Sequence, residues 1–373
     1  MRYVKLVVAT LLAAASLAAA AAPRSTSDVP ADPALVTGTL PNGLRYEILS
    51  NATPPHNAAL RLRIDAGSLV EKEDERGIAH FVEHMAMAGS RNVTEGEMER
   101  RLERAGLRFG PDTNAFTDFR QTWYVLNLPE TDPATLDTAL TLLREAAGEA
   151  SFAPASIERQ RGIILAEERS RATAAARSSE DYLHFLLRGD LLPERIVIGR
   201  PDIIRTVPRE RLVRFYDAYY RPERATLIAV GDFDPAKMEA EIRRLFGTWH
   251  GRGRGGGPPP PPVVPMRAAE AHVFVDAALP PQVTLAWPAP ADLRPDSRAV
   301  RAARLVDGLA LAVLNRRIGR ISAAGPLVSA AAARTTFFRR ADIITLGGVA
   351  KPGQVKEALA RLLREQQGAM LQP

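Results

Sequence analysis

A run of glycines followed by prolines divides this chain of 373 residues into two parts. Residues 251–265 read GRGRGGGPPPPPVVP. Glycine offers no side chain to pack and consecutive prolines keep the chain extended, so such a run forms a spacer rather than part of a core. It therefore predicts two folding units, 35–250 and 266–373, joined by a linker over 251–265. The alternative is a proline-rich ligand for a partner protein.

The first 22 residues have the pattern of a secretory signal peptide. Arg2 and Lys5 precede an uncharged run over 6–22, whose alanines offer A-x-A cleavage sites before Pro23. The alternative is an uncleaved anchor, but the run is barely long enough to span a bilayer and is rich in Ala rather than Leu. No later stretch is long and apolar enough to span one. We therefore expect export across the inner membrane into a bacterial periplasm, with no membrane span after cleavage.

Composition excludes several classes of protein. The chain is 46% hydrophobic and 25% charged, which excludes a disordered, collagen-like or polytopic membrane protein. The absence of cysteine excludes disulfides, zinc-thiolate sites and thiol nucleophiles, and suits an oxidising compartment. The net charge is +6 and arginine supplies nearly all of the positive charge. These arginines are scattered without an aromatic-basic motif, so we do not expect nucleic-acid binding.

The order of the expected helices and strands predicts an α+β fold. Alternating or buried apolar runs predict strands at 45–49, 60–64, 122–128, 225–230, 271–276, 282–287 and 343–349. Helical patterns cover 77–88, 94–105, 133–150, 155–175, 210–219, 235–246, 297–320 and 354–367. We expect Thr94 to cap the second of these helices and the stretch after the fourth to be irregular. We expect a mostly antiparallel sheet flanked by helices, then a similar but incomplete second domain.

Two of the six histidines lie four residues apart, in His80-Phe-Val-Glu83-His84. Residues i and i+4 share one face of a helix, so both imidazoles can reach one ion. Zn²⁺ in such a site takes two His, a carboxylate and an open water position, and Glu83 can take the proton of that water. H-x-x-E-H is a known metallopeptidase motif. The alternative is a chance grouping on a surface helix, and the motif leaves the third ligand open.

The motif and its surroundings resemble the pitrilysin/insulinase family of zinc peptidases, M16. Residues 75–90 resemble the family's active-site helix. Further resemblances follow in chain order over nearly the whole mature chain: Leu40-Pro-Asn-Gly-Leu44, Asp65-Ala-Gly-Ser68, Asn114-Ala115-x-Thr117 with Thr122-x-Tyr124, Phe215-Tyr216 to Pro222, Val230-Gly-Asp232 and Leu314-Asn-Arg-Arg-Ile318. The resemblance implies a secreted zinc endopeptidase that hydrolyses peptides or unfolded segments.

The resemblance also implies the remaining site residues. The family's third zinc ligand is a Glu in a later helix, which corresponds to Glu167, with the neighbouring Glu168 ranked second because it points about 100° away. Gln160 stands beside the ligands where the family usually has Glu, so we expect lower ligand basicity. Asn114 and Ala115 resemble residues that bind the substrate backbone along an edge strand, although Asn114 also suits a turn.

Two other functions stay open at this stage. The family often pairs active with degenerate halves, so the chain could be a non-catalytic subunit or a peptide-binding protein that needs a partner half. A different zinc hydrolase on the same scaffold is the third possibility. The second domain spans only about half the length of the first and would leave apolar surface uncovered. We therefore expect a second M16-like half, in a longer chain or in a partner chain.

Overall fold

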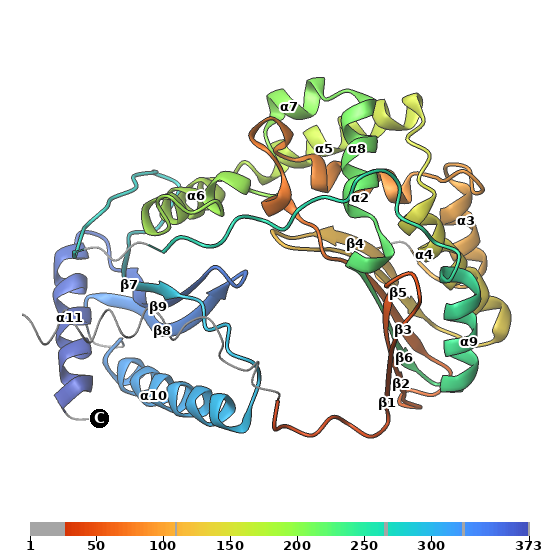
Figure 1. The fold of residues 1–373 in the computed structure, drawn as a ribbon. Helices are drawn as coiled ribbons and strands as arrows, with labels where there is room; N and C mark the ends of the chain where they lie inside the picture. The colour runs from red at the N-terminus through yellow and green to blue at the C-terminus, as the bar shows by residue number, and fades with distance from the viewer. Residues whose placement is uncertain (1–26, 109, 265–267, 323–324, 372–373) are drawn as a thin grey trace, which may run out of the picture.

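The computed structural model describes residues 27–108, 110–264, 268–322 and 325–371. The predicted signal peptide over 1–22 lies outside these residues. Two sheets, one on each side of the Gly/Pro segment, form the framework of the molecule (Figure 1). In the part of the chain that the structure describes, no helix combines the length and the apolar character needed to cross a bilayer.

Six strands form the larger sheet, in the order β1-β2-β6-β3-β5-β4. Their bounds are β1 Leu35–Thr39, β2 Arg45–Ser50, β3 Ala58–Ile64, β4 Thr113–Thr117, β5 Thr122–Leu128 and β6 Ala225–Gly231. Neighbouring strands are antiparallel except for β2 and β6, which run parallel. The prediction of a mostly antiparallel sheet is confirmed.

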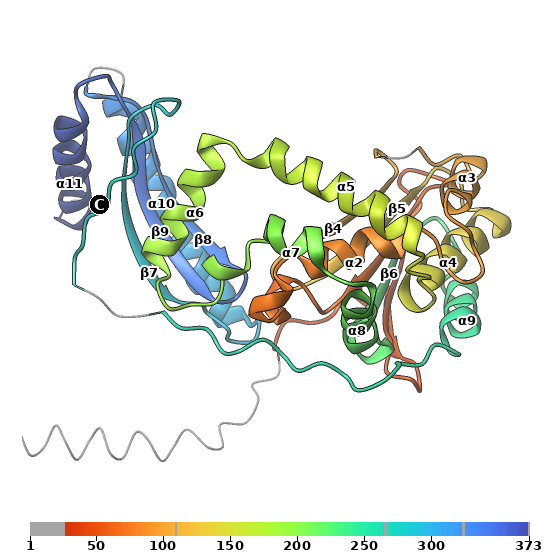
Figure 2. The same cartoon turned by 90° about the horizontal axis from the view of Figure 1, so that it is seen from above.

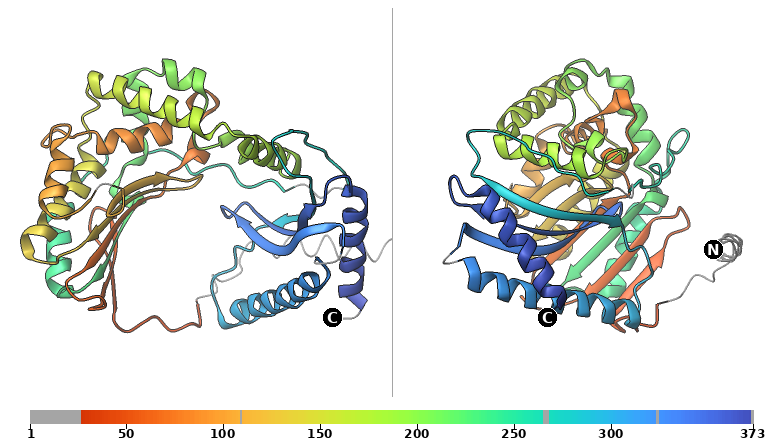
Figure 3. Two further views of the ribbon diagram at one scale, coloured as in Figure 1. Left: turned by 180° about the vertical axis from the view of Figure 1, so that it is seen from behind. Right: turned by 90° about the vertical axis from the view of Figure 1, so that its left-hand side faces the viewer.

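One face of this sheet carries the core. On β3, Leu60 and Leu62 are fully buried, while Arg61 and Arg63 on the opposite face are half-buried, as period-two alternation requires. The helices gather on the apolar face, and no helix of the described residues covers the other face (Figures 1 and 3). They are α2 Ile78–Met87, α3 Glu97–Arg104, α4 Pro133–Gly148, α5 Pro154–Arg171, α7 Pro201–Thr206, α8 Arg209–Tyr219 and α9 Pro235–Phe246.

The second sheet has three antiparallel strands in the order β7-β9-β8. These are β7 Gln282–Pro290, β8 Leu327–Phe337 and β9 Ala341–Ala350, with α10 Arg298–Ser322 and α11 Val355–Leu371 beside them. The sequence analysis missed β8, and the strand it predicted over 271–276 is wrong. That segment has no strand partner, and ion pairs from His272 to Asp181 and from Asp276 to Arg177 hold it instead.

Two helix predictions need correction. The stretch expected to be irregular contains α6, Ala174–Leu186, because the Thr173 hydroxyl accepts from the Ala176 N–H at 3.1 Å and starts a new helix after α5 ends. Figure 2 shows α5 and α6 reaching together from the larger sheet to the smaller one. Thr94 does not cap α3, which begins at Glu97 after Gly96 with φ 75°.

A buried ion pair joins the two units. Arg340, in the turn between β8 and β9, donates from Nε and Nη2 to Asp190 at 2.7 and 2.8 Å, and both side chains are at most 5% exposed. Arg340 also donates to the carbonyl of Pro260 at 2.9 Å, while Asp190 accepts from the Val263 N–H at 2.8 Å. The Gly/Pro segment is therefore extended and held by hydrogen bonds at this point.

Candidate metal centre

Helix α2 carries the H-x-x-E-H residues into the interior of the larger unit. Eight of its ten residues are buried, and it packs against β4, α4, α5 and α8. Phe81, Val82 and Met85 belong to the core, whereas His80 and Glu83, at 5% and 6% exposure, line a cleft. The 3.6-residue period of the helix accounts for this separation of apolar and polar side chains.

Three possible metal ligands converge at this cleft. The Nε2 atoms of His80 and His84 are 3.3 Å apart, and Oε2 of Glu167, on α5, lies 3.6 and 3.7 Å from them. A tetrahedral Zn²⁺ with bonds of about 2.0–2.2 Å separates its ligand atoms by roughly 3.3–3.6 Å. The donor set and its spacing fit one zinc ion. Glu168 is not part of this cluster.

The protonation of the two histidines suits metal binding. Burial, with a contribution from His84, lowers the pKa of His80 to about 3, so its imidazole is neutral. Nδ1 of His84 lies 3.0 Å from Oε1 of Gln160. Since an amide oxygen only accepts, Nδ1 carries the proton and Nε2 presents its lone pair to the cluster. Nδ1 of His80, by contrast, is buried without a hydrogen-bond partner among the described residues.

Glu83 is held beside these three residues by β4. The hydroxyl of Thr117 donates to Oε2 of Glu83 at 2.8 Å. Burial raises the pKa of Glu83 to about 7 even though the Thr117 hydrogen bond opposes this shift. A carboxyl group near neutral pKa can both accept and return a proton. Thr117 stands in the Asn114-Ala115-x-Thr117 pattern, but sequence analysis gave it no role, because its contact with Glu83 depends on how β4 packs against α2.

A cleft of about 980 Å³ opens over the cluster. Its walls come from α2, α3, α5 and β4, and include Gln160 as well as Asn114, Ala115 and Phe116. Strand β4 is the edge of the sheet, so one side of its backbone has no strand partner among the residues that the structure describes. Asn114 is exposed, and its Oδ1 accepts from the Ala115 N–H at 2.9 Å. Arg171, on the rim, forms an ion pair with Glu167.

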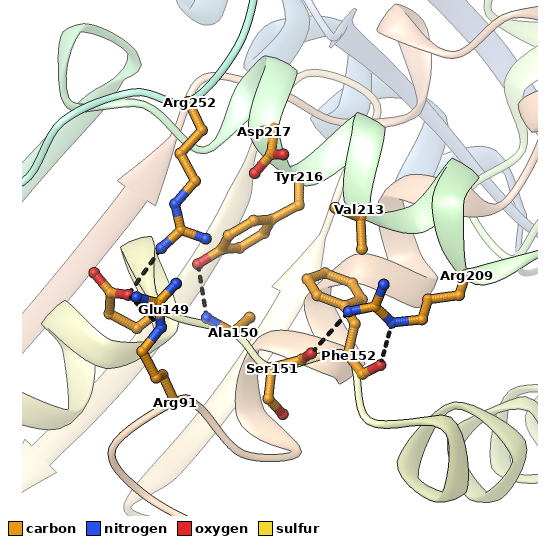
Figure 4. A pocket seen from close by; sticks show the side chains of 10 residues that line it. All are labelled: Arg91, Glu149, Ala150, Ser151, Phe152, Arg209, Val213, Tyr216, Asp217 and Arg252. Carbon is orange, nitrogen blue, oxygen red and sulfur yellow. Dashed lines mark hydrogen bonds and ion pairs between the residues drawn. The ribbon is translucent and has the colours of Figure 1, made fainter.

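A smaller pocket of about 250 Å³ lies between the end of α4 and α8 (Figure 4). Its guanidinium groups are paired within the chain, since Arg252 contacts Glu149 at 2.8 Å and Arg209 donates to the Phe152 carbonyl at 2.9 Å. The N–H of Arg91, shortly after α2, donates to the Glu149 carbonyl at 2.8 Å. These contacts anchor the chain after the C-terminal end of α2, so we assign the pocket a structural role.

Comparisons with known proteins point to one family. Residues 47–188 match the profile of the insulinase family, peptidase family M16, and residues 206–368 match that of the peptidase M16 inactive domain. The second match begins before α8 and β6, which belong to the larger unit.

Relatives and solved structures agree with these profiles. The chain is 38% identical over 236 residues, 63% of its length, to the Escherichia coli protein described as "Probable zinc protease PqqL". The crystal structure of the periplasmic protease PqqL from Escherichia coli superposes with a TM-score of 0.81 at 28% identity, covering 90% of this chain and 38% of that one. The structure of its first half gives a TM-score of 0.78 at 27% identity, covering 90% and 72%.

The chain spans about a quarter of the length of the curated bacterial PqqL proteins it matches. Within that length, both family profiles match the chain, and its two-sheet fold and H-x-x-E-H helix are consistent with them. The chain therefore belongs to peptidase family M16, the insulinase family.

Proposed function

We propose that this chain is the zinc-binding part of an M16 endopeptidase that hydrolyses peptides or unfolded segments. The observation that carries the proposal is the convergence of His80, His84 and Glu167 within 4.8 Å of one another, with Glu83 on the same helix as both histidines. In this proposal His80, His84 and Glu167 hold the metal and Glu83 is the general base. When bound, Zn²⁺ would acidify a water and polarise the scissile carbonyl.

Three side chains of this protein have separate roles in the proposed reaction. Glu83 takes the proton of the attacking water and passes it to the leaving amine, and its pKa of about 7 suits both steps. Thr117 keeps one carboxylate oxygen of Glu83 in place. Gln160 holds the ring of His84 through Nδ1. Because Gln160 is uncharged, it orients this ring without the increase in basicity that a carboxylate would give.

We propose that the substrate adds to the open edge of β4. An extended peptide beside an edge strand pairs with its free backbone groups, and Asn114 and Ala115 lie on β4 where it lines the cleft. This mode of binding recognises the backbone of an extended segment. It therefore favours peptides and unfolded chains over folded proteins.

Metal analysis tests the site directly. The purified chain should contain about one zinc ion, and His80→Ala or His84→Ala should lose it, because each removes one of three protein ligands. Glu167→Gln should also weaken zinc binding. Zinc content that none of these substitutions changes would exclude this site.

A peptidase assay separates catalysis from binding. Glu83→Gln should retain zinc but lose nearly all turnover of a fluorogenic peptide, because it removes the base and keeps the ligands. A chelator should abolish turnover by the unmodified chain. Peptide binding without cleavage and without a chelator effect would support the non-catalytic alternative, and cleavage restricted to esters or non-peptide amides would support a different hydrolase.

We also propose that a second M16-like half, in the same chain or a partner chain, covers the second unit. Helix α10 exposes Leu305, Leu309 and Val313 at 64%, 57% and 54%, and soluble monomers rarely leave such a surface uncovered. Light scattering should show association of the isolated chain that Leu305→Glu and Leu309→Glu together remove. A strictly monomeric chain that binds no apolar dye would contradict the proposal.

A periplasmic location is proposed from two observations. Residues 1–22 have a signal-peptide pattern, and the PqqL structures that the chain resembles are described as those of a periplasmic protease. A reporter enzyme that is active only after export, fused behind residues 1–30, should be active in a bacterial host. Loss of that activity after replacing Arg2 and Lys5 with Glu would support the signal, and an inactive fusion would exclude it.

A further inference from the structure

Helix α2 begins without a cap from its own first residues. Its N-cap, Gly77, has φ 105° and no side chain that could accept from the first-turn N–H groups, which have no partner within the helix. Glycine is required here because of this φ and because a Cβ would lie 2.9 Å from Cα of Gly199. The groups that satisfy the first turn must therefore come from elsewhere in the chain.

Glu71, six residues before the N-cap, supplies the acceptors for these N–H groups. Its Oε2 accepts from the Gly77 N–H at 3.1 Å, and its Oε1 accepts from the Ala79 N–H at 2.8 Å. The residue is only 4% exposed, so water does not compete freely for these donors. Both carboxylate oxygens are thus bonded to the turn that immediately precedes His80.

The position of Glu71 is fixed independently of α2. Nε of Arg195 donates to the Glu71 carbonyl at 3.1 Å, and the Glu71 N–H donates to the Ser68 carbonyl at 3.1 Å. The Ser68 hydroxyl in turn donates to the Arg195 carbonyl at 2.6 Å. Ser68 and Arg195 are both buried, so these contacts form a rigid support.

The two histidines differ in what orients them. The ring of His84 is held by Gln160, but Nδ1 of His80 has no hydrogen-bond partner among the described residues. The direction of the His80 side chain therefore depends on the backbone of the first turn and on packing. Fraying of that turn would displace His80 and leave His84, one turn later, in place.

We propose that Glu71 is a positioning residue of the metal centre, which fixes the first turn of α2 and through it the direction of His80. This inference rests on the proposed function, because it assumes that His80 is a metal ligand. Glu71 touches neither the metal nor the substrate in this role. It acts through the backbone of Gly77 and Ala79.

The test is the zinc dissociation constant, measured by competition with a chromophoric chelator well below the melting temperature of the metal-free protein. Glu71→Ala should weaken zinc binding about 10- to 100-fold, the range typical of residues that orient metal ligands. Glu71→Gln keeps one acceptor, so its zinc affinity should lie between those of Glu71→Ala and the unmodified chain. The matched control is Glu75→Ala, since Glu75 is also buried in this segment but accepts from the Lys72 N–H and not from α2. The zinc affinity of this variant should stay within about threefold of that of the unmodified chain.

A purely structural role would lower the melting temperature of the metal-free variant and leave the zinc affinity unchanged, which would overturn the proposal. If Glu71→Ala does not fold, amide hydrogen exchange of metal-free Glu71→Gln replaces it. Exchange should rise at least tenfold at whichever of Gly77 and Ala79 loses its acceptor, while exchange in β3 stays the same, and unchanged exchange at both would overturn the inference. An unmodified chain that binds no zinc would instead show that the proposed function itself is wrong.

Discussion

The two sheets of this chain differ in how completely their helices are packed. In the larger unit, α2 has eight of its ten residues buried between the sheet and neighbouring helices. In the smaller unit, α10 has 25 residues, but among those described only Val300 and Ile318 are buried. Both helices pack against a sheet. Helix α2 also packs against α4, α5 and α8, whereas α10 contacts α11 near its C-terminal end through Arg317 and Glu365.

The sequence of α10 explains this contrast. Ile318, with Leu311 and Leu314 beside it, packs on the second sheet. Leu305, Leu309 and Val313 follow one another at intervals of four residues, so they form a second apolar stripe on the helix, and this stripe is exposed. A helix that is apolar on two sides is suited to be buried on both. The helices of the larger unit are therefore covered on several sides, whereas α10 leaves an apolar stripe exposed.

The largest expected effect concerns the ion pair that joins the two units. Asp190→Asn leaves the buried Arg340 without its counter-charge and should cost about 3–5 kcal/mol. Hydrogen-exchange mass spectrometry should show faster exchange in β8 and β9 and unchanged exchange in β3. The control is Asp296→Asn, which breaks an exposed pair with Arg301 and should leave exchange in both sheets unchanged. Equal acceleration of both sheets would show that the units unfold together.

The next effect tests the core of the larger unit. Leu62 is fully buried on β3, near the middle of the sheet. Leu62→Ala should lower the free energy of unfolding by about 2–5 kcal/mol, because it removes buried methyl groups and leaves a cavity. Urea denaturation measures this loss in the free energy of unfolding. A loss below about 1 kcal/mol would mean that this core is less tightly packed than the structure shows.

An effect that is smaller per pH unit is the opposite pH dependence of the two units. Burial raises the pKa of Glu71 from 4.5 to about 8. The unfolded chain releases this proton near pH 4.5 and the folded chain near pH 8, so in between the folded state binds more protons. The free energy of unfolding of the metal-free larger unit should therefore fall as the pH rises from about 5 to 8, by at most about 1.4 kcal/mol per pH unit for this group.

Asp342 gives the smaller unit the opposite trend. Burial opposes the shift, but hydrogen bonds from Thr336 and Arg334 hold the pKa of Asp342 below its usual value. Its contribution is present above pH 4 or so and is lost as the pH falls through the lowered pKa. Hydrogen exchange at a series of pH values, corrected for intrinsic rates, measures both trends. Glu71→Gln should reduce the first trend, to which Glu83 also contributes, and leave the second unchanged, and a flat profile in the unmodified chain would contradict the assignment.

The smallest effect should come from the exposed stripe of α10. At concentrations where the chain is monomeric, Leu309→Ala should change the free energy of unfolding by no more than about 0.5 kcal/mol, because a side chain that is 57% exposed loses little burial. Comparison with Leu62→Ala in the same urea experiment makes this a matched pair. A loss of 2 kcal/mol or more would show that the isolated chain already packs this stripe against something.

Much of the larger unit was predictable because its signals are local. The alternation of Leu60 and Leu62 with Arg61 and Arg63 fixes which face of β3 is buried. The helix over 235–246 was predicted with the bounds that α9 has in the structure. The smaller unit was predicted less well. The alanines of β8 gave no alternating signal, and the apparent strand over 271–276 has no neighbour with which to pair.

The sequence alone determined that two histidines and a glutamate share the polar side of one helix, because residues three and four apart lie together on any α-helix. It also predicted a linker over 251–265, since a run of glycine and proline builds neither a helix nor a sheet. The tertiary structure decided which distant groups meet this helix: Gln160 at His84, Thr117 at Glu83 and the buried contacts of Glu71. Such contacts depend on how separate elements pack, and spacing along the chain carries no information about that packing.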